Sequence, residues 1–333
     1  MPSKTIKSLL LGNSLMTRSL LYSFLLGLII APFFALSIAG ILFHAFFPDT
    51  KLFILSVNVL VFASLIYFLI AIAIFLRFFV LISVFPLPPR TVKYDSLSNK
   101  KITVCLTAYN DEGIIGDAVK DFKSHKLVDE VIVVDNNCSD NTAGEAKKAG
   151  AIIVKEPIQG FGAASIRALK TALQKAKPKN NLVLFVEGDQ TFVSKDIDKF
   201  VSYIDNADMV IGTRTTKELA TKDSQVTRPI QYSNLFLAKL IQLKYWGTVR
   251  LTDVGCSMRL IRCNALEKTI PLYSVTGSAF SPHMIDMVLK KGFRVIEIPV
   301  YFKKRGGTSK GIGSDFIKGF PTGLEMIWNI LTQ

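Results

Sequence analysis

The sequence predicts an α/β protein, with a Rossmann-like, mostly parallel sheet preceded by two membrane-spanning helices. From about residue 101 to residue 211, short apolar segments alternate with amphipathic segments, in the order of repeated βα units. Two long uncharged segments come before this region. A pair of carboxylates, Glu187 and Asp189, directly follows one apolar segment, at the place where open parallel sheets bind their ligands.

The first 90 residues contain two apolar segments that predict a transmembrane hairpin. They run from about residue 20 to 47 and from about residue 52 to 84, and each can cross a hydrocarbon core about 30 Å thick. A buried helix would be shorter and have a polar face, and a signal peptide would have a shorter apolar region. We therefore expect residues 1–90 to form a membrane domain and residues 91–333 to form an α/β domain.

The distribution of charge predicts how this hairpin is oriented. Three basic residues precede the first span, and a basic group lies near the end of the second span and after it: Arg77, Arg90, Lys93, Lys100 and Lys101. The positive-inside rule then places both ends of the hairpin, and everything after residue 90, in the cytoplasm. The four cysteines lack metal-ligand spacing, which agrees with reduced thiols in that compartment.

The net charge indicates an anionic partner. It is +14 in total, of which residues 1–90 contribute +5 and the rest +9. A basic domain tethered to a bilayer is drawn to anionic lipid headgroups. Nucleic acid could also explain the charge, but the sequence has no nucleic-acid-binding motif, so we expect no nucleic acid partner.

The elements of the α/β domain follow from changes in apolar periodicity. Strands are expected at 102–108, 130–134, 151–154, 182–186 and 208–211. Helices are expected between them at 114–122, 142–148, 163–176 and 197–204. After residue 215 the periodicity is less regular, and it predicts helices at 230–243 and 284–290 and a strand at 293–301.

Residue chemistry narrows the ligand. Carboxylates at Glu187 and Asp189 could hold a divalent cation that neutralises a diphosphate, although a solvated turn is the simpler alternative. Gly160 and Gly162 open a predicted helix, which is a suitable setting for phosphate. They lack the third glycine of the dehydrogenase fingerprint and follow the third strand instead of the first. No phosphate loop with Gly-Lys-Ser/Thr occurs, which argues against a P-loop NTPase.

Six motifs, in order between residues 101 and 311, resemble those of a known family. They are TAYNDE at 107–112, VDNNCSDNT at 134–142, EGD at 187–189, GTR at 212–214, DVGCSMR at 253–259 and RGGTSK at 305–310. They resemble inverting nucleotide-sugar glycosyltransferases of the GT-A fold, and most of all dolichol-phosphate mannose synthases and related polyprenyl-phosphate sugar transferases. The resemblance implies a GDP- or UDP-linked sugar donor, a polyprenyl phosphate acceptor, and Mg²⁺ or Mn²⁺ as cofactor.

The resemblance also implies roles for individual residues. It implies nucleotide-sugar binding by Ala108, Tyr109, Asn110, Glu112, Asp135, Asn137, Gly162, Glu187, Gly188 and Arg214. The implied metal ligands are Glu187 and Asp189, and the implied ligands of the acceptor phosphate are Arg228, Arg305, Ser309 and Lys310. The implied catalytic residues are Asp189, Arg214, Asp253 and Arg305. Two alternatives stay open here, because Asp135 could cap a helix and Asp253 could orient an arginine.

Three departures from the family pattern keep other functions in view. Glu187 stands where the family has aspartate, Phe161 stands between two glycines where a lysine is common, and the predicted spans come before the catalytic domain. One alternative is a polysaccharide or other glycolipid synthase, although Gln242–Trp246 lacks the arginine of the corresponding motif. Another is a catalytically silent membrane protein that binds nucleotide sugars.

Overall fold

The structure is a computed structural model. It describes residues 94–176, 181–221, 227–245, 248–306 and 316–333, together with positions 62, 65, 66, 69 and 70. The chain divides into two compact units, residues 1–89 with 243–247 and residues 90–242 with 248–333, and the second unit carries the sheet. The predicted spans at 20–47 and 52–84 lie outside the described residues except at those five positions. Among the residues that are described, none belongs to a helix with both the length and the apolar character needed to cross a membrane.

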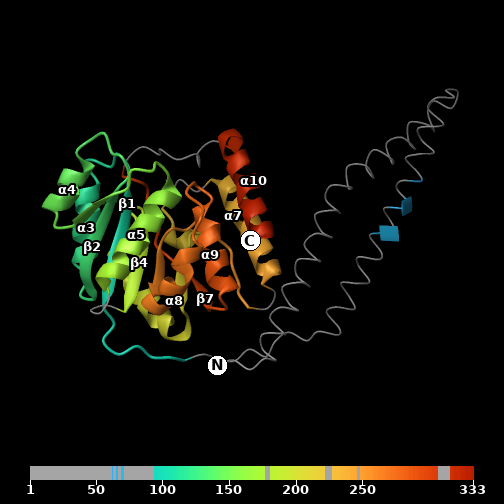
Figure 1. The fold of residues 1–333 in the computed structure, drawn as a ribbon, viewed down its shortest axis with the longest axis horizontal. Coiled ribbons are helices and arrows are strands. Elements are labelled where there is room, and N and C mark those ends of the chain that lie inside the picture. The colour runs from blue at the N-terminus through green and yellow to red at the C-terminus, as the bar shows by residue number, and fades with distance from the viewer. Residues whose placement is uncertain are drawn as a thin grey trace. The chain divides into compact units, whose positions relative to one another are not determined.

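In the described part of the chain, seven strands form one sheet in the order β3-β2-β1-β4-β6-β5-β7. Figure 1 shows this sheet together with the helices that pack on it. They are β1 (Ile102–Ala108), β2 (Val128–Asp135), β3 (Ile152–Lys155), β4 (Leu182–Glu187), β5 (Met209–Thr213), β6 (Arg259–Arg262) and β7 (Val295–Pro299). Strand β6 is antiparallel to its neighbours β4 and β5, and the other neighbouring strands pair in parallel. Thr107 lies opposite Glu187, and Ala108 lies opposite Asp135. The carboxyl ends of β1, β2 and β4 therefore meet at one edge.

Helices cover both faces of the sheet. They are α3 (Ile115–Lys123), α4 (Thr142–Lys148), α5 (Phe161–Ala176), α6 (Ile197–Tyr203), α7 (Arg228–Lys244), α8 (Cys263–Thr269), α9 (Phe280–Lys290) and α10 (Phe316–Thr332). Side chains of α3 and α6, among them Phe122 and Phe200, join strand residues such as Leu184 in one buried cluster. Helix α5 packs against β1, β2 and β4, and its Phe161 ring lies 6.2 Å from that of Phe185 on β4. A parallel sheet covered in this way is typical of α/β domains.

The predicted alternation of strands and helices is confirmed from β1 to β5, and the first strand and the helix at 142–148 have the predicted bounds. The prediction lacks β6, α8 and α10. Because β6 is antiparallel to its neighbours, the sheet is mostly parallel, as predicted. Strand β6 contains two arginines, so it does not form the apolar segment that predicts a buried strand. The buried guanidinium of Arg262 donates hydrogen bonds to the carbonyls of Ile204 and Ala207, which offsets the cost of burying its charge.

Candidate active site

Three carboxylates, Asp111, Glu187 and Asp189, meet at the carboxyl ends of β1 and β4, and we call them the acidic group. Glu187 is the last residue of β4, and Asp189 follows it by two residues. The backbone N–H of Gly188 donates to the carbonyl of Thr107 at 3.0 Å, which ties the ends of the two strands together. A Cβ at Gly188 would lie 2.5 Å from the side chain of Ile115, so a larger residue would push this edge apart.

Arg305 supplies positive charge to the acidic group from the segment after β7. Its Nη1 lies 3.4 Å from Asp189 Oδ2, and its Nη2 lies 3.7 Å from Asp111 Oδ1. Backbone hydrogen bonds from Lys303 to Thr191 and from Gly306 to Asp189 hold this segment beside the end of β4. The Nε of Arg305 is buried and has no hydrogen-bond partner among the described residues.

The acidic group retains an unbalanced negative charge. Burial and the charge of Asp189 together raise the pKa of Glu187 to about 7, against the lowering effects of Arg305, a hydrogen bond with Ser257, and Arg214. Carboxylate oxygens are the ligands that Mg²⁺ and Mn²⁺ prefer, so the chemistry of Glu187 and Asp189 fits the predicted metal. No group of three or more His, Cys, Asp or Glu residues arranged to hold a metal occurs in the described ranges. A cation here would take further ligands from substrate or water.

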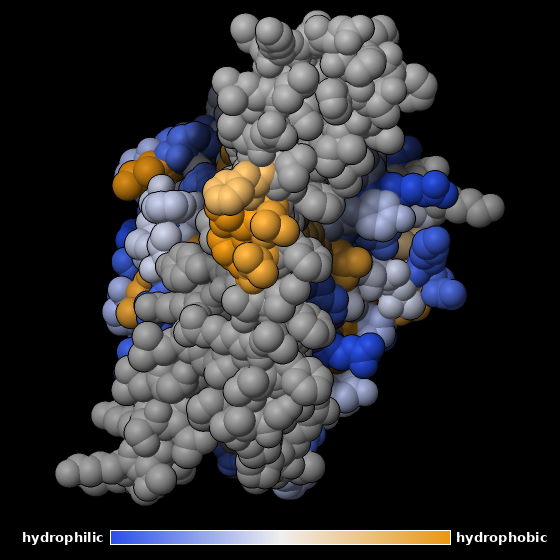
Figure 2. Space-filling model, turned by 90° about the vertical axis from the view of Figure 1, so that its right-hand side faces the viewer, coloured by the Kyte–Doolittle hydropathy of each residue, from blue (hydrophilic) through white to orange (hydrophobic). Residues whose placement is uncertain are grey.

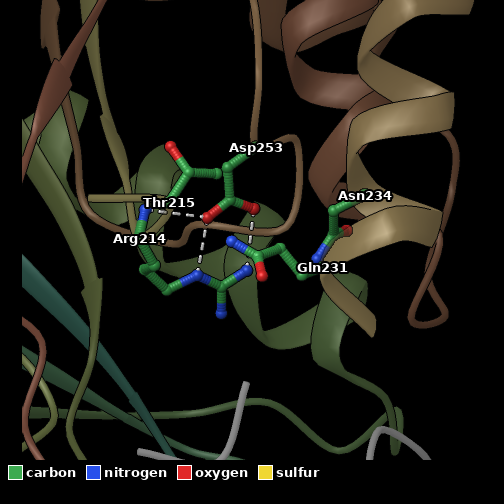
Figure 3. Close-up of a pocket in the computed structure, with 5 residues that line it drawn as sticks. All are labelled: Arg214, Thr215, Gln231, Asn234 and Asp253. Carbon is green, nitrogen blue, oxygen red and sulfur yellow. Dashed lines mark hydrogen bonds and ion pairs between the residues drawn. The ribbon is translucent and has the colours of Figure 1, made fainter. Parts of the chain in front are cut away.

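A second set of residues forms a small pocket next to β5, which we call the Arg214 pocket. It is lined by Arg214, Thr215, Gln231, Asn234 and Asp253 (Figure 3). Arg214 and Asp253 form a bidentate ion pair, with Nε 2.7 Å from Oδ2 and Nη2 2.8 Å from Oδ1. The backbone N–H of Arg214 also donates to Oδ2. Burial raises the pKa of Asp253, but the charge and hydrogen bonds of Arg214 outweigh it and hold this pKa below its usual value.

The Arg214 pocket presents several hydrogen-bond donors to a ligand. The guanidinium nitrogen that the ion pair does not use points away from Asp253, and Gln231 extends from α7 toward the pair (Figure 3). A Cβ at Gly255 would lie 2.8 Å from Arg214 Nη2 and 2.7 Å from Asn234 Oδ1, so these two side chains converge there. A guanidinium, a hydroxyl and two amides suit an anion with several oxygens.

The predicted donor-binding residues after β1 hold neighbouring loops in place. Asn110 adopts a positive φ of 51°, and its Oδ1 accepts a hydrogen bond from the backbone N–H of Ser139 at 2.7 Å. Glu112 Oε2 accepts from the backbone N–H of Asn141 at 3.1 Å. Tyr109 is 40% exposed. Asn110 and Glu112 thus join the loop after β1 to the loop after β2.

The predicted residues at the end of β2 also hold neighbouring loops in place. Asp135 is buried, and its Oδ1 accepts from the backbone N–H of Cys138 at 2.9 Å. Asn137 adopts a φ of 59°, and its Nδ2 donates to the carbonyl of Pro157 at 2.7 Å. The carbonyl of Ala108 accepts from the backbone N–H of Asn136. These contacts bring Asp135 and Asn137 to the same edge as the acidic group.

Four other predicted residues lie elsewhere or outside the described residues. Gly162 lies in the first turn of α5, where a Cβ would lie 2.3 Å from the carbonyl oxygen of Val275. This close approach of the backbone leaves no room for a side chain, which explains why residue 162 is a glycine. Arg228 is exposed at the first position of α7. Ser309 and Lys310 lie outside the described residues.

Sequence reasoning missed several residues of the site. Asp111 lies within the motif TAYNDE, and its position three residues after a predicted strand was a usable signal. Ser257 lies within DVGCSMR and forms a hydrogen bond with Glu187. Gln231 and Asn234 offered no such signal, because they reach the pocket from α7, and sequence spacing alone does not place α7 beside Arg214.

Comparison with known proteins identifies the family. The model of glycosyl transferase family 2 matches residues 103–270. The chain is 27% identical over 213 residues to a dolichyl-phosphate hexose transferase of Haloferax volcanii, covering 63% of this chain and 86% of that protein. It is 24% identical over 228 residues to a low-salt glycan biosynthesis hexosyltransferase of the same organism, covering 67% and 51% respectively.

A solved structure shows the same fold. Glucosyl-3-phosphoglycerate synthase of Mycobacterium tuberculosis, crystallised with Mn²⁺, UDP-glucose and phosphoglyceric acid, aligns with a TM-score of 0.52 at 16% identity. The alignment covers 70% of this chain and 79% of that one. The family match spans half of the chain and includes Glu187, Asp189, Arg214 and Asp253. The protein is therefore a glycosyltransferase with the GT-A fold, and the chain belongs to glycosyl transferase family 2.

Proposed function

We propose that this protein is a membrane-bound inverting glycosyltransferase that moves a hexose from a nucleotide-diphosphate sugar to a polyprenyl phosphate. The observation that carries the proposal is the pairing of the acidic group with two arginines. Arg305 contacts Asp189 and Asp111, and both Arg305 and Arg214 are close enough to lower the pKa of Glu187. A transfer between two phosphate-bearing substrates requires a site of this kind, because both substrates bring negative charge to one place.

The acidic group is the proposed donor site. Glu187 and Asp189 would hold Mg²⁺ or Mn²⁺, which would neutralise charge on the departing nucleoside diphosphate. Asp135 and Tyr109 lie at the ends of the adjacent strands and are proposed to contact the nucleoside. The Mn²⁺ and UDP-glucose named for the mycobacterial structure support this assignment.

The Arg214 pocket, together with Arg305, is the proposed acceptor site. This assignment differs from the role that the family resemblance implies for Arg214, which is nucleotide-sugar binding. A lipid phosphate is already ionised at neutral pH, so it can attack the anomeric carbon without a strong general base. The protein then has to bind the phosphate in line with the departing group, and displacement in this geometry inverts the anomeric centre. The free guanidinium nitrogen of Arg214 and the buried Nε of Arg305 are the proposed donors. Arg228, Ser309 and Lys310 stay predicted ligands of the same phosphate.

The dolichyl phosphate in the name of the Haloferax relative supports a lipid acceptor. We also propose that residues 1–90 anchor the protein in the membrane and that the catalytic domain is cytoplasmic. Five described positions of this part are hydrophobic and exposed, namely Phe62, Leu65, Ile66, Leu69 and Ile70, and all five are helical. Figure 2 shows a hydrophobic patch on the face of the molecule that it presents.

A donor screen tests the proposed reaction. Purified protein would be incubated with polyprenyl phosphate, Mg²⁺ or Mn²⁺, and a panel of UDP- and GDP-linked hexoses, and glycolipid would be measured by mass spectrometry. We expect one donor to give a polyprenyl-phosphate hexose. A polymeric product would favour a polysaccharide synthase, and donor binding with no turnover on any acceptor would favour a silent nucleotide-sugar binder.

Cysteine labelling tests the topology. In a Cys138→Ser background, a cysteine at Asp49 in the predicted loop should react with an impermeant maleimide added to intact cells. A cysteine at Asp117, whose side chain is 71% exposed, is the matched control and should react only after lysis. Labelling of the Asp117 position in intact cells would overturn the proposed orientation.

A further inference from the structure

The ion pair between Arg214 and Asp253 depends on a loop, residues 252–257, that two charged side chains hold from opposite sides. On one side, Glu297 of β7 accepts three hydrogen bonds. Its Oε1 accepts from the backbone N–H groups of Thr252 at 2.9 Å and Asp253 at 2.8 Å, and its Oε2 accepts from the Thr252 hydroxyl at 2.7 Å. Glu297 therefore holds the backbone of the residue that carries the Asp253 carboxylate.

On the other side, Arg259 of β6 holds the carbonyl groups of the same loop. Its guanidinium is fully buried and donates to the carbonyls of Cys256 and Val254, at 2.9 Å in each case, and of Ser281 at 2.7 Å. Arg259 thus fixes the end of the loop near β6. The end that carries Asp253 is held through its N–H groups by Glu297.

The Asp253 carboxylate has little freedom left for a ligand of its own. Oδ2 accepts from the Nε and backbone N–H of Arg214, and Oδ1 accepts from Arg214 Nη2 and the backbone N–H of Gly255. Asp253 therefore orients Arg214, whose remaining guanidinium nitrogen points away from the pair (Figure 3). A cation–π contact, with the guanidinium carbon of Arg214 5.4 Å from the centre of the Phe302 ring, further limits the movement of the Arg214 side chain.

We propose that Glu297 is a positioning residue for substrate transfer, acting on Arg214 through Asp253. It makes no contact with Arg214 in the described structure, but it sets the backbone from which Asp253 reaches the guanidinium. The inference rests on the proposed function, because it takes Arg214 to bind the acceptor phosphate. Mutating groups that orient metal ligands typically costs about 10–100-fold in affinity or activity, and we expect an effect of the same order for Glu297.

Two substitutions at Glu297 separate hydrogen bonding from charge. In Glu297→Gln, the amide oxygen can still accept from the two backbone N–H groups, and the amide nitrogen can donate to the Thr252 hydroxyl. It should therefore keep acceptor KM within about threefold of wild type. Glu297→Leu leaves the two N–H groups without this partner, so the loop shifts and acceptor KM should rise by about 10-fold or more.

A matched control removes the same kind of contact elsewhere. Asp121 of α3 accepts from the backbone N–H and the hydroxyl of Ser194, both at 2.8 Å, as Glu297 does with Thr252. Asp121→Leu should lower thermal stability but leave acceptor KM unchanged. Affinity for UDP and GDP, measured by calorimetry, should stay near wild type in all these variants, since the proposed donor site lies at the ends of β1, β2 and β4. If Glu297→Leu does not fold, Thr252→Val removes only the hydrogen bond from the Thr252 hydroxyl to Glu297, and acceptor KM should rise by a smaller factor.

A double-mutant cycle tests the route through Arg214. Arg214→Lys keeps the charge but loses the planar geometry that pairs with Asp253. In that background, Glu297→Leu should change acceptor KM by less than about twofold, whereas independent effects would multiply. Multiplying effects, or an unchanged acceptor KM in the single Glu297→Leu variant, would overturn the inference. If Arg214→Lys itself leaves acceptor KM unchanged, the proposed acceptor role of Arg214 fails, and the inference fails with it.

Discussion

The acidic group and the Arg214 pocket lie in one domain, yet the chain assembles them in different ways. The acidic group comes from the ends of two parallel neighbours, β1 and β4, and each of its residues lies within three positions of a strand end. The Arg214 pocket takes residues from the segment after β5, from α7 and from the loop before the antiparallel strand β6. The first site follows from sheet register, and the second depends on long-range packing. Substitutions in the two sites should therefore have different effects on activity and stability.

The largest effect is expected from breaking the acidic group at Asp189. Asp189→Ala removes a proposed metal ligand and one carboxylate partner of Arg305, and transfer should fall by about 10³-fold. Excess chelator should do the same to the wild type. The activity would be measured as glycolipid formed at saturating donor and acceptor. Asp117→Ala, which removes an exposed carboxylate on α3, is the control and should have no effect. Full activity in excess chelator would rule out the metal.

A smaller effect is expected from breaking the Arg214 pocket. Arg214→Ala should lower kcat/KM for polyprenyl phosphate by about 10²-fold, while UDP and GDP affinities stay within about twofold. It also leaves the buried Asp253 carboxylate without its guanidinium partner, so thermal stability should fall. Arg214→Lys should recover part of the activity. A variant that lost nucleotide affinity and kept acceptor KM would place Arg214 at the donor site instead.

Arg305 tests the boundary between the two regions, because it contacts the acidic group and is proposed to bind the acceptor. Arg305→Ala should raise acceptor KM by about 10-fold, with nucleotide affinity near wild type. Arg305→Lys should restore only part of the affinity for the acceptor, since an ammonium lacks the planar geometry that binds two oxygens. The opposite pattern, lost nucleotide affinity with normal acceptor use, would assign Arg305 to the diphosphate and leave the lipid phosphate to Arg214, Arg228 and Lys310.

The smallest effect is expected from the titration of Glu187 in the metal-free protein. Its pKa is raised from 4.5 to about 7, so folding favours the neutral acid. This contribution to stability is complete below about pH 4.5 and is lost as the pH rises through about 7. Glu187→Gln stays neutral, so its melting temperature, relative to wild type, should rise by about 2–4 °C between pH 5 and pH 8 in chelator.

Metal should reverse this pH dependence in the wild type. Binding requires the ionised carboxylate, so added Mn²⁺ should stabilise the wild type more at pH 8 than at pH 5. Glu187→Gln should show a smaller gain from Mn²⁺ at either pH. A wild-type melting temperature that followed Glu187→Gln at every pH would contradict the raised pKa.

The part of the fold that could be predicted is the part in which local pattern and tertiary role agree. Strand β1 is buried along its whole length and reads as an apolar segment. Strand β6 is as deeply buried, but two of its four residues are arginines that donate hydrogen bonds to carbonyls in distant parts of the chain. Helix α10 contains Pro321, and Gly319 and Gly323 beside it also argue against a helix. Local pattern could not identify either element.

The sequence by itself determined the βα alternation, the carboxylates at the strand ends and the family motifs. These are local properties, since a strand end and the polar residues after it are contiguous in the chain. Only the tertiary structure decided that Asp253 pairs with Arg214, that Arg305 contacts Asp189, and that Glu297 holds the backbone of Asp253. Each of these pairs joins residues at least 39 positions apart. The physical reason is that an ion pair or buried hydrogen bond depends on distance in space, which residue types and local spacing do not encode.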